Sequence, residues 1–294
     1  MYNWDRIRAI IYWKYNCIYL EDGEGILVEK VRGSLLLIGG AEDKEGEKKI
    51  LKRFASLVRE KDSYLLILTS AASQAGQVGR EYREIFQELG IEDVKILDID
   101  SRVEAMSPEN AGLLGKAGGI FFTGGDQLRI TSNFGGTRAY AALKEAYEGG
   151  TVVAGTSAGA SAVSTIMIVG GEGEDSPRLN SVRLAAGLGL LEGVVIDQHF
   201  AQRGRMNRLL FAVAYNPQIL GIGIDEDTAV EFQEETSFLV HGSRTVTVID
   251  GRGISHSNIS ELEGEQALAL LNVKLHVLPA GYAYNLNTGK VIIP

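Results

Sequence analysis

Residues 151–163 read TVVAGTSAGASAV and contain the pattern that decides the fold. The apolar run at the start is typical of a buried strand, and the small residues at the end suit the start of a helix. Between them Gly155 and Gly159 each lie two residues from Ser157. Glycines at these positions remove the Cβ atoms that would clash in a sharp strand-to-helix turn. The stretch therefore predicts a turn with an exposed serine at its apex.

This serine turn predicts nucleophilic chemistry. The hydroxyl of Ser157 would stand above the sheet, and the N–H of Ala158 would point to the space where an oxyanion forms. Glycine is abundant, with 36 among 294 residues, so a plain Gly/Ser turn is the alternative. The strand and helix that flank the motif favour acyl transfer through serine.

Composition limits the class of protein. The chain is 45% hydrophobic and 23% charged, which is typical of a globular protein with one large domain or two small ones. A net charge of -9 argues against nucleic acid as the main partner and is compatible with cationic substrates. The sequence has no long apolar run for a membrane span and no signal-peptide pattern. The single Cys17 excludes internal disulfides, so we expect a cytoplasmic protein.

From residue 34 to about residue 225, short apolar runs alternate with longer amphipathic segments. This rhythm is typical of an α/β fold with a mostly parallel sheet covered by helices on both faces. The expected strands are residues 34–38, 64–69, 94–99, 119–123, 151–154, 194–197 and 220–224, and the expected helices are residues 48–58, 78–89, 108–116, 138–147 and 203–215.

The pattern changes after Asp225. Short alternating runs at residues 229–232, 237–241, 245–249, 274–278 and 290–293 predict an antiparallel extension at the edge of the sheet. We therefore expect residues 31–294 to form a single α/β domain.

Residues 1–30 show no period of 2 or 3.6 and are expected to be an irregular N-terminal extension. One hypothesis is that the natural chain starts near Val28. The alternative is an arm that packs on the domain or on a partner subunit.

His199 is the candidate general base among the four histidines. It follows the strand expected at residues 194–197, at the end where doubly wound sheets bind their ligands. Ser157 ends a strand at the same edge, so the two side chains are expected to come within hydrogen-bonding reach. A loop histidine bonded to the backbone is the alternative. The other three histidines lie in late strand patterns or a polar loop and are expected to be structural or solvated.

A third group, an acid, would hold the histidine. In α/β-hydrolases the chain order is Ser, acid, His. The loop at residues 170–177 lies between Ser157 and His199 and offers Glu172, Glu174 and Asp175. From spacing alone, any one of the three fits.

A second glycine-rich strand end, residues 121–127, is expected beside the serine turn. The N–H of Gly125 would approach the oxyanion from the other side. Asp126 would cap the next helix in a simple strand-to-helix turn, and both roles are compatible.

Arg203, Arg205 and Arg208 lie in the expected first turns of a helix. The helix dipole disfavours a cation there by about 0.3–1 kcal/mol each. An anion is therefore expected nearby, either a substrate carboxylate or acids of the protein itself. A solvated basic face is the alternative.

Four motifs together resemble the cyanophycinases of the S51 family of serine peptidases. The resemblance covers nearly everything from residue 33 to residue 294. The motifs are IGGAED at residues 38–43, FTGGDQ at residues 122–127, GTSAGA at residues 155–160, and DQHF at residues 197–200 followed by R-x-R-x-x-R.

The resemblance implies a catalytic triad. Ser157 would be the nucleophile and His199 the base. The family's third member is an acid, usually Glu, just before a Ser-Pro pair, and Asp175 stands at that position here. The positions that match substrate-binding residues of the family are Gln127, Asp197, Gln198, Arg203, Arg205 and Arg208.

The resemblance also implies a three-layer α/β/α sandwich that is commonly dimeric and uses no cofactor and no metal. The implied reaction is hydrolysis of cyanophycin, a poly-aspartate backbone carrying arginines, to β-Asp-Arg dipeptides. The basic residues would bind aspartate carboxylates, while Asp126 or Asp197 would bind the arginine guanidinium. The implied partner is thus cyanophycin or an Asp-containing peptide, with neither nucleic acid nor membrane.

Two other functions compete with this hypothesis. An aspartyl dipeptidase of the same family shares the serine turn, but the DQHF motif and the arginine cluster favour the polymer hydrolase. A non-catalytic member of the glutamine-amidotransferase-like fold is disfavoured because Ser157, His199 and an acid coexist. The serine turn contains no cysteine, which argues against amidotransferase chemistry.

Overall fold

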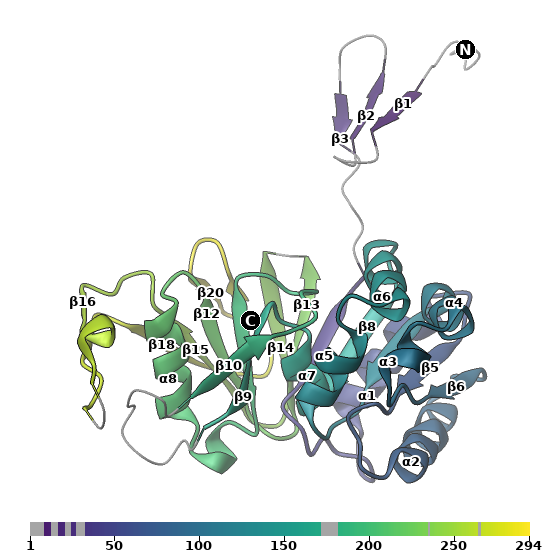
Figure 1. Ribbon diagram of the computed structural model, residues 1–294, viewed down its shortest axis with the longest axis horizontal. Coiled ribbons are helices and arrows are strands. Elements are labelled where there is room, and N and C mark those ends of the chain that lie inside the picture. The colour runs from purple at the N-terminus through teal and green to yellow at the C-terminus, as the bar shows by residue number, and fades with distance from the viewer. Residues whose placement is uncertain are drawn as a thin grey trace.

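The computed structural model describes residues 9–12, 17–20, 25–27, 33–171, 182–234, 236–263 and 266–294. Its largest sheet contains five neighbouring parallel strands (Figure 1). In spatial order these are β4 (Leu35–Ile38), β8 (Val152–Thr156), β7 (Gly119–Phe122), β5 (Leu65–Leu68) and β6 (Val94–Leu97). All of them except β6 are buried at every position, which explains their continuous apolar runs.

Antiparallel strands extend this sheet to nine strands on the β4 side. They confirm the extension expected at residues 229–232, 237–241 and 290–293, whereas the expected runs at residues 245–249 and 274–278 lie in another sheet. Outward from β4 they are β13 (Thr228–Glu234), β14 (Ser237–Gly242), β19 (Ala283–Asn285) and β20 (Lys290–Ile292).

Helices cover both faces of the parallel part, which gives the expected three layers. Alternate residues of β4 point to opposite faces. Leu36 and Ile38 pack with α1 (Lys49–Arg59) and α2 (Ala75–Glu88). Leu35 and Leu37 belong to the core on the other face. That second core also includes side chains of α3 (Arg102–Ala105), α4 (Pro108–Lys116), α5 (Gln127–Phe134) and α6 (Arg138–Glu148).

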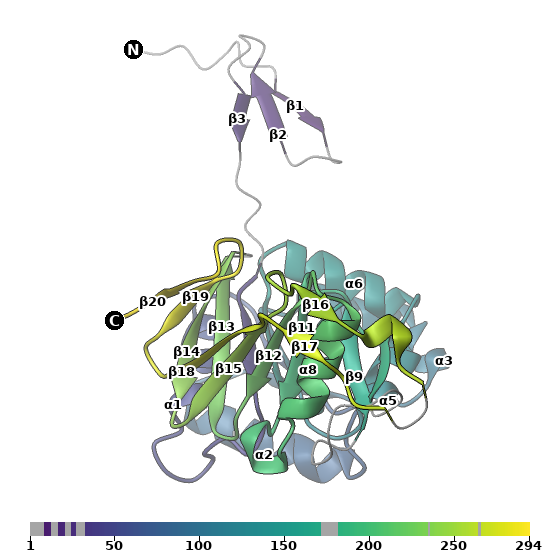
Figure 2. The ribbon, with the colours of Figure 1, turned by 90° about the vertical axis from the view of Figure 1, so that its left-hand side faces the viewer.

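A separate four-stranded sheet carries the remaining expected strands (Figure 2). Its strands β11 and β12 are parallel, whereas β15 and β18 are antiparallel additions. α8 (Met206–Tyr215) packs on one face, and the other face joins the same core as Leu35 and Leu37. In spatial order the strands are β11 (Val194–Gln198), β12 (Leu220–Ile224), β15 (Thr245–Asp250) and β18 (Lys274–Pro279).

This division differs from the sequence expectation, in which β11 and β12 continued one parallel sheet. Hydrophobic periodicity identifies a strand but does not identify its neighbour.

Shorter elements complete the domain: α7 (Ala158–Ala162), the hairpin of β9 (Ile166–Gly170) and β10 (Arg183–Ala186), the 3-10 helices η2 (Ala201–Arg203) and η3 (Ile259–Glu261), and the pair β16 (His256–Ser257) and β17 (Leu270–Leu271).

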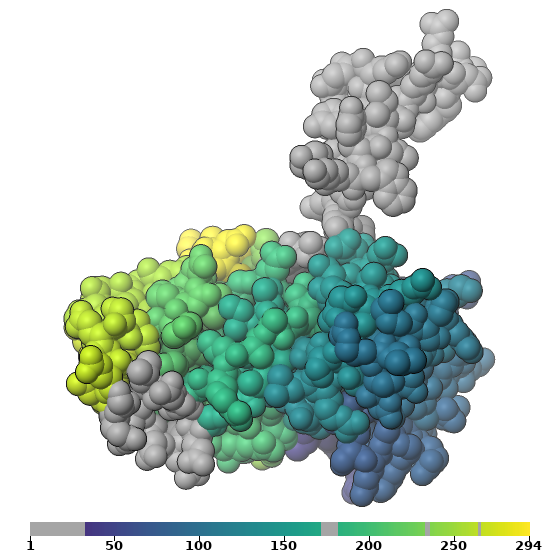
Figure 3. Space-filling view, viewed as in Figure 1, coloured from purple at the N-terminus to yellow at the C-terminus, as the bar shows by residue number. Residues whose placement is uncertain are grey.

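The helix expected at residues 203–215 is split. Gly204 has φ +58 and separates η2 from α8, which starts at Met206. In Figure 3 the blue and dark teal residues, which include α2 to α4, lie at one end of the domain, and the yellow-green residues around β16 and η3 lie at the other.

The N-terminal segment contains three short antiparallel strands, where the sequence predicted an irregular extension. They are β1 (Ala9–Tyr12), β2 (Cys17–Leu20) and β3 (Gly25–Leu27), paired in that order. Their sequences, AIIY, CIYL and GIL, are apolar at nearly every position, so no alternation of apolar and polar residues appears in them.

Candidate active site

Ser157 stands in a strained turn between β8 and α7. Its backbone has φ 53 and ψ -112, a region that residues with a side chain rarely occupy. A Cβ on Gly155 would lie 2.4 Å from the carbonyl carbon of Gly159, and one on Gly159 would lie 2.5 Å from the oxygen of Phe122. The glycines are therefore needed for the close approach of strand and helix, as the sequence predicted.

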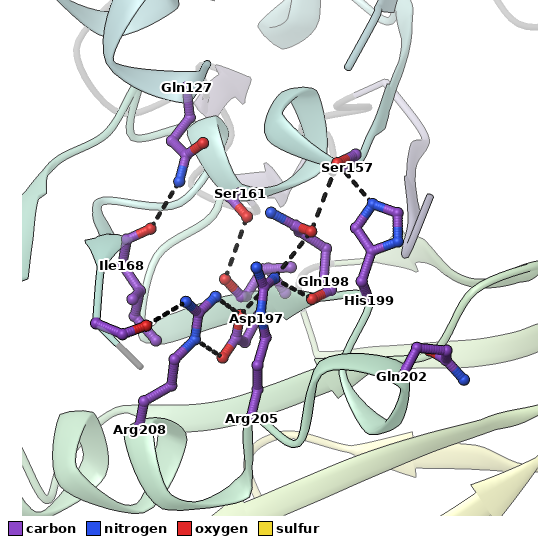
Figure 4. Close-up of polar contacts among 12 residues, drawn as sticks. Gln127, Ser157, Ser161, Ile168, Asp197, Gln198, His199, Gln202, Arg205 and Arg208 are labelled. Atoms are coloured by element: carbon purple, nitrogen blue, oxygen red, sulfur yellow. Dashed lines mark hydrogen bonds and ion pairs between the residues drawn. The ribbon is translucent and has the colours of Figure 1, made fainter. Parts of the chain in front are cut away.

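His199 lies at the end of β11 and faces Ser157 (Figure 4). Its Nε2 is 3.0 Å from the Oγ of Ser157. The backbone N–H of His199 donates to the oxygen of Gly39 at 2.8 Å, and a Cβ on Gly40 would lie 2.4 Å from the imidazole ring. The two side chains meet as expected, although their strands belong to different sheets.

The other ring nitrogen of His199 contacts Glu226. The Nδ1 of His199 is 2.7 Å from Oε1 of Glu226, in the turn between β12 and β13. The N–H of Glu226 donates to Oε1 of Gln202 at 2.9 Å. Asp175, the acid expected from the sequence, lies outside the described residues.

The contact of Glu226 with His199 was not predicted from the sequence, because the Ser, acid, His chain order places the acid between Ser157 and His199. One signal was available. Glu226 follows the strand expected at residues 220–224 by two residues, so it lies at the same kind of strand end as His199.

The environment of His199 favours a neutral imidazole. Burial is the largest effect and lowers the pKa of His199 below its ordinary value of 6.5. The hydrogen bond to Glu226 raises the pKa, while the nearby cations Arg203 and Arg205 lower it. The net shift is downward, so the ring is ready to accept a proton at neutral pH.

The turn between β7 and α5 packs against Ser157. A Cβ on Gly124 would lie 3.3 Å from the Cβ of Ser157. Gly125 has φ +143, and a Cβ there would lie 2.0 Å from the oxygen of Ala71. Asp126 caps α5 by accepting from the N–H of Leu128 at 2.8 Å, the capping role considered from the sequence. The turn thus brings glycine backbone to the serine without intervening side chains.

Gln127 spans from α5 to β9. Its Nε2 donates to the oxygen of Ile168 at 2.9 Å (Figure 4). This contact holds the β9–β10 hairpin beside the serine turn, so the Gln127 amide is already engaged within the protein.

Two of the three clustered arginines are buried against Asp197. Asp197 is 1% exposed and Arg208 is 7% exposed. The Nε of Arg208 donates to Oδ2 of Asp197 at 2.6 Å, and its Nη2 donates to Oδ1. Arg205 lies 3.4 Å from the same carboxylate. Of the two anions considered from the sequence, a protein acid is therefore the one that Arg205 and Arg208 contact.

Arg205 also connects this cluster to Ser157. Its Nη1 donates to Oε1 of Gln198 at 2.9 Å, and the Oγ of Ser157 lies 3.5 Å from the same oxygen (Figure 4). Burial lowers the pKa of Arg205 to about 10, so it stays charged at neutral pH. Arg203, in contrast, is exposed.

The family model of peptidase family S51 matches residues 35–240. The chain belongs to peptidase family S51. It is 40% identical over 259 residues to a cyanophycinase from Geminocystis herdmanii (strain PCC 6308), covering 88% of this chain and 95% of that protein. It is 37% identical over 261 residues to a cyanophycinase from Synechococcus elongatus, covering 88% and 81%.

A solved structure supports the fold of this S51 chain. The crystal structure of a peptidase from an acI-B1 Actinobacterium matches with a TM-score of 0.61 at 23% identity and covers 83% of this chain and 97% of that one. Within the described part of the chain, no helix is both long and apolar enough to cross a membrane.

Proposed function

We propose that this S51 family member is a serine peptidase that hydrolyses cyanophycin to β-Asp-Arg dipeptides. The observation that carries the proposal is the continuous chain of contacts from Ser157 through His199 to Glu226, with separations of 3.0 Å and 2.7 Å. The names of the relatives that are 37–40% identical over 88% of the chain support the substrate.

The triad acts through the two nitrogens of one ring. Glu226 accepts a hydrogen bond from Nδ1 of His199, which leaves Nε2 free to accept the proton of Ser157. The Oγ of Ser157 then attacks the backbone carbonyl of the polymer. His199 returns the proton to the leaving amine, and water hydrolyses the acyl-enzyme by the same route. In this proposal Glu226, and not Asp175, orients the imidazole.

Backbone N–H groups stabilise the oxyanion. The N–H of Ala158 lies in the first turn of α7, where amides lack an intrahelical partner. The N–H of Gly125 belongs to the glycine turn that packs against Ser157. We assign the oxyanion to these two donors, since both segments border the serine without bulky side chains.

Exposed charged groups near Ser157 and His199 bind the substrate. Arg203 is exposed and close enough to lower the pKa of His199, which places a cation beside the Ser157–His199 pair. We assign it to a substrate carboxylate, and the exposed Asp126 to an arginine guanidinium. Asp197, Gln198, Arg205 and Arg208 act on the substrate through the loop that they hold, because their polar groups bond to one another.

One assay tests the proposed function. The purified protein is incubated with insoluble cyanophycin and separately with Asp-Leu, beside the Ser157→Ala variant. We expect clearing of cyanophycin and release of β-Asp-Arg by the wild type only. Cleavage of Asp-Leu alone would favour an aspartyl dipeptidase, and cleavage of neither would favour a non-catalytic protein. Release that survives Ser157→Ala would rule out the serine mechanism.

We also propose that the protein is a cytoplasmic homodimer. The single cysteine suits a reducing compartment, and the resemblance to cyanophycinases supports the dimer. Light scattering coupled to size exclusion measures the mass, and a monomeric mass would contradict the dimer. Cell fractionation tests the compartment.

A further inference from the structure

Residues 39–43, which follow β4, link the loops that carry the catalytic base and acid; we call them the bridging segment. The oxygen of Gly39 accepts from the N–H of His199 at 2.8 Å, and the oxygen of Gly40 accepts from the N–H of Asp227 at 2.9 Å. Asp227 directly follows Glu226. Gly40 and Ala41 have φ +96 and +46, so the segment makes a tight, strained turn at this point.

The side chain of Glu42 ties the bridging segment to the nucleophile. Glu42 is only 4% exposed, and its Oε2 accepts from the Oγ1 of Thr156 at 2.6 Å. Its Oε1 accepts from the hydroxyl of Tyr82 in α2. Thr156 is 3% exposed and immediately precedes Ser157. Glu42 thus contacts the strand end that carries the serine, while its own segment contacts the loops that carry His199 and Glu226.

Burial of the Glu42 carboxyl group costs free energy, because the group loses its hydrogen bonds to water. An apolar side chain of similar volume would fill the space without the cost of removing a polar group from water. Two acceptor oxygens, however, match two hydroxyl donors that each have one hydrogen. Lys44 adds a cation 4.2 Å from the centre of the Tyr82 ring. The two hydrogen bonds fix the orientations of the Thr156 and Tyr82 hydroxyl groups, which an apolar contact would leave free.

We propose that Glu42 is a positioning residue for the hydrolysis. It fixes Thr156, and through Thr156 the direction of the Ser157 hydroxyl toward His199, without contacting substrate. This inference rests on the proposed function only in taking Ser157 as the nucleophile. In Glu42→Gln the amide keeps the shape but offers one acceptor oxygen in place of two, so a hydroxyl loses its partner.

The test measures how fast a fluorophosphonate probe labels Ser157, because this reaction needs an activated serine but no polymer. We expect Glu42→Gln and Thr156→Val to label roughly 10–100-fold more slowly, as small displacements of reacting groups do. The double variant should be no slower than the slower single variant, because both remove one link. Thr156→Ser keeps the hydroxyl and should label within about threefold of the wild type.

Tyr82→Phe is the matched control, because it removes the other hydroxyl bonded to Glu42 but leaves Thr156 in place. It should lower the melting temperature but label within about threefold of the wild type. If Glu42→Gln does not fold, the comparison of Thr156→Val with Thr156→Ser still tests the link.

Three results would overturn the positioning role: wild-type rates in both Glu42→Gln and Thr156→Val, equal rates in Thr156→Ser and Thr156→Val, or a loss in Tyr82→Phe as large as that in Glu42→Gln. Absence of labelling in the wild type would overturn this inference and the serine mechanism together. Labelling without hydrolysis of cyanophycin would overturn only the proposed substrate.

Discussion

The nine-stranded and four-stranded sheets supply different parts of the site. Ser157 follows β8, which lies between β4 and β7 in the larger sheet, and its position is set by the glycine turn. His199 and Glu226 follow β11 and β12, two neighbouring parallel strands of the smaller sheet. Ser157 is therefore positioned by one sheet, whereas His199 and Glu226, which we propose as its base and acid, are positioned by the other. The geometry of the Ser157–His199–Glu226 contacts therefore depends on how the two sheets pack together.

Gly40, which follows β4 of the larger sheet, packs directly against the imidazole ring of His199. A Cβ on Gly40 would lie 2.4 Å from Cε1 and Nε2 of the ring, at the nitrogen that faces Ser157. We expect Gly40→Ala to displace the ring and to lower kcat/KM at least about 100-fold.

Gly136→Ala is the matched control for this prediction. Gly136 also has a positive φ, +72, but nothing lies within 4 Å of a Cβ there. The control carries the same kind of backbone strain without the clash and should keep near wild-type kcat/KM. Equal losses in the two variants would show that strain, and not the contact between sheets, matters.

The buried cluster of Asp197 and Arg208 stabilises the smaller sheet and α8. Asp197→Asn leaves two buried guanidinium groups without their carboxylate, and such changes cost about 3–5 kcal/mol of unfolding free energy. Denaturant unfolding measures the loss. Arg203→Ala, in the same arginine motif but exposed, should change the unfolding free energy by no more than about 0.5 kcal/mol. Equal effects would contradict the assignment of Asp197 and Arg208 to the interior.

The pH dependence of kcat/KM tests whether the cations beside His199 lower its pKa. The expected change is the smallest of those predicted. Because the pKa of His199 is lowered, the acid limb of kcat/KM should lie below pH 6.5, with activity rising as the imidazole loses its proton. Arg203→Gln removes a cation that disfavours the protonated ring. The acid limb should therefore move to higher pH in this variant. A shift of the acid limb to lower pH would contradict the placement of the Arg203 cation beside His199.

The parts of the molecule that depend on local sequence could be predicted. The turn that carries Ser157 and the strand end before His199 were both predicted, because sharp turns and strand ends have local residue signals. The seven strands expected between residues 34 and 224 are all present.

The parts that depend on distant contacts could not be predicted. Which sheet receives β11 and β12 depends on pairing partners and not on periodicity. Glu226 reaches His199 because the turn after β12 lies beside the turn after β11, a relation that chain order does not reveal. The arginine cluster predicted a nearby anion, but only the fold shows Asp197 beside Arg205 and Arg208.

A comparison of Glu226→Gln with Asp175→Asn tests the central claim most directly, since it asks which carboxylate holds His199. Both substitutions remove a charge with little change in shape, and kcat/KM on cyanophycin is measured for each. We predict a loss of about 10³–10⁴-fold for Glu226→Gln, the scale seen when a triad acid becomes an amide, and a loss below about threefold for Asp175→Asn. Near wild-type activity in Glu226→Gln with a large loss in Asp175→Asn would contradict the role of Glu226 as the acid that holds His199.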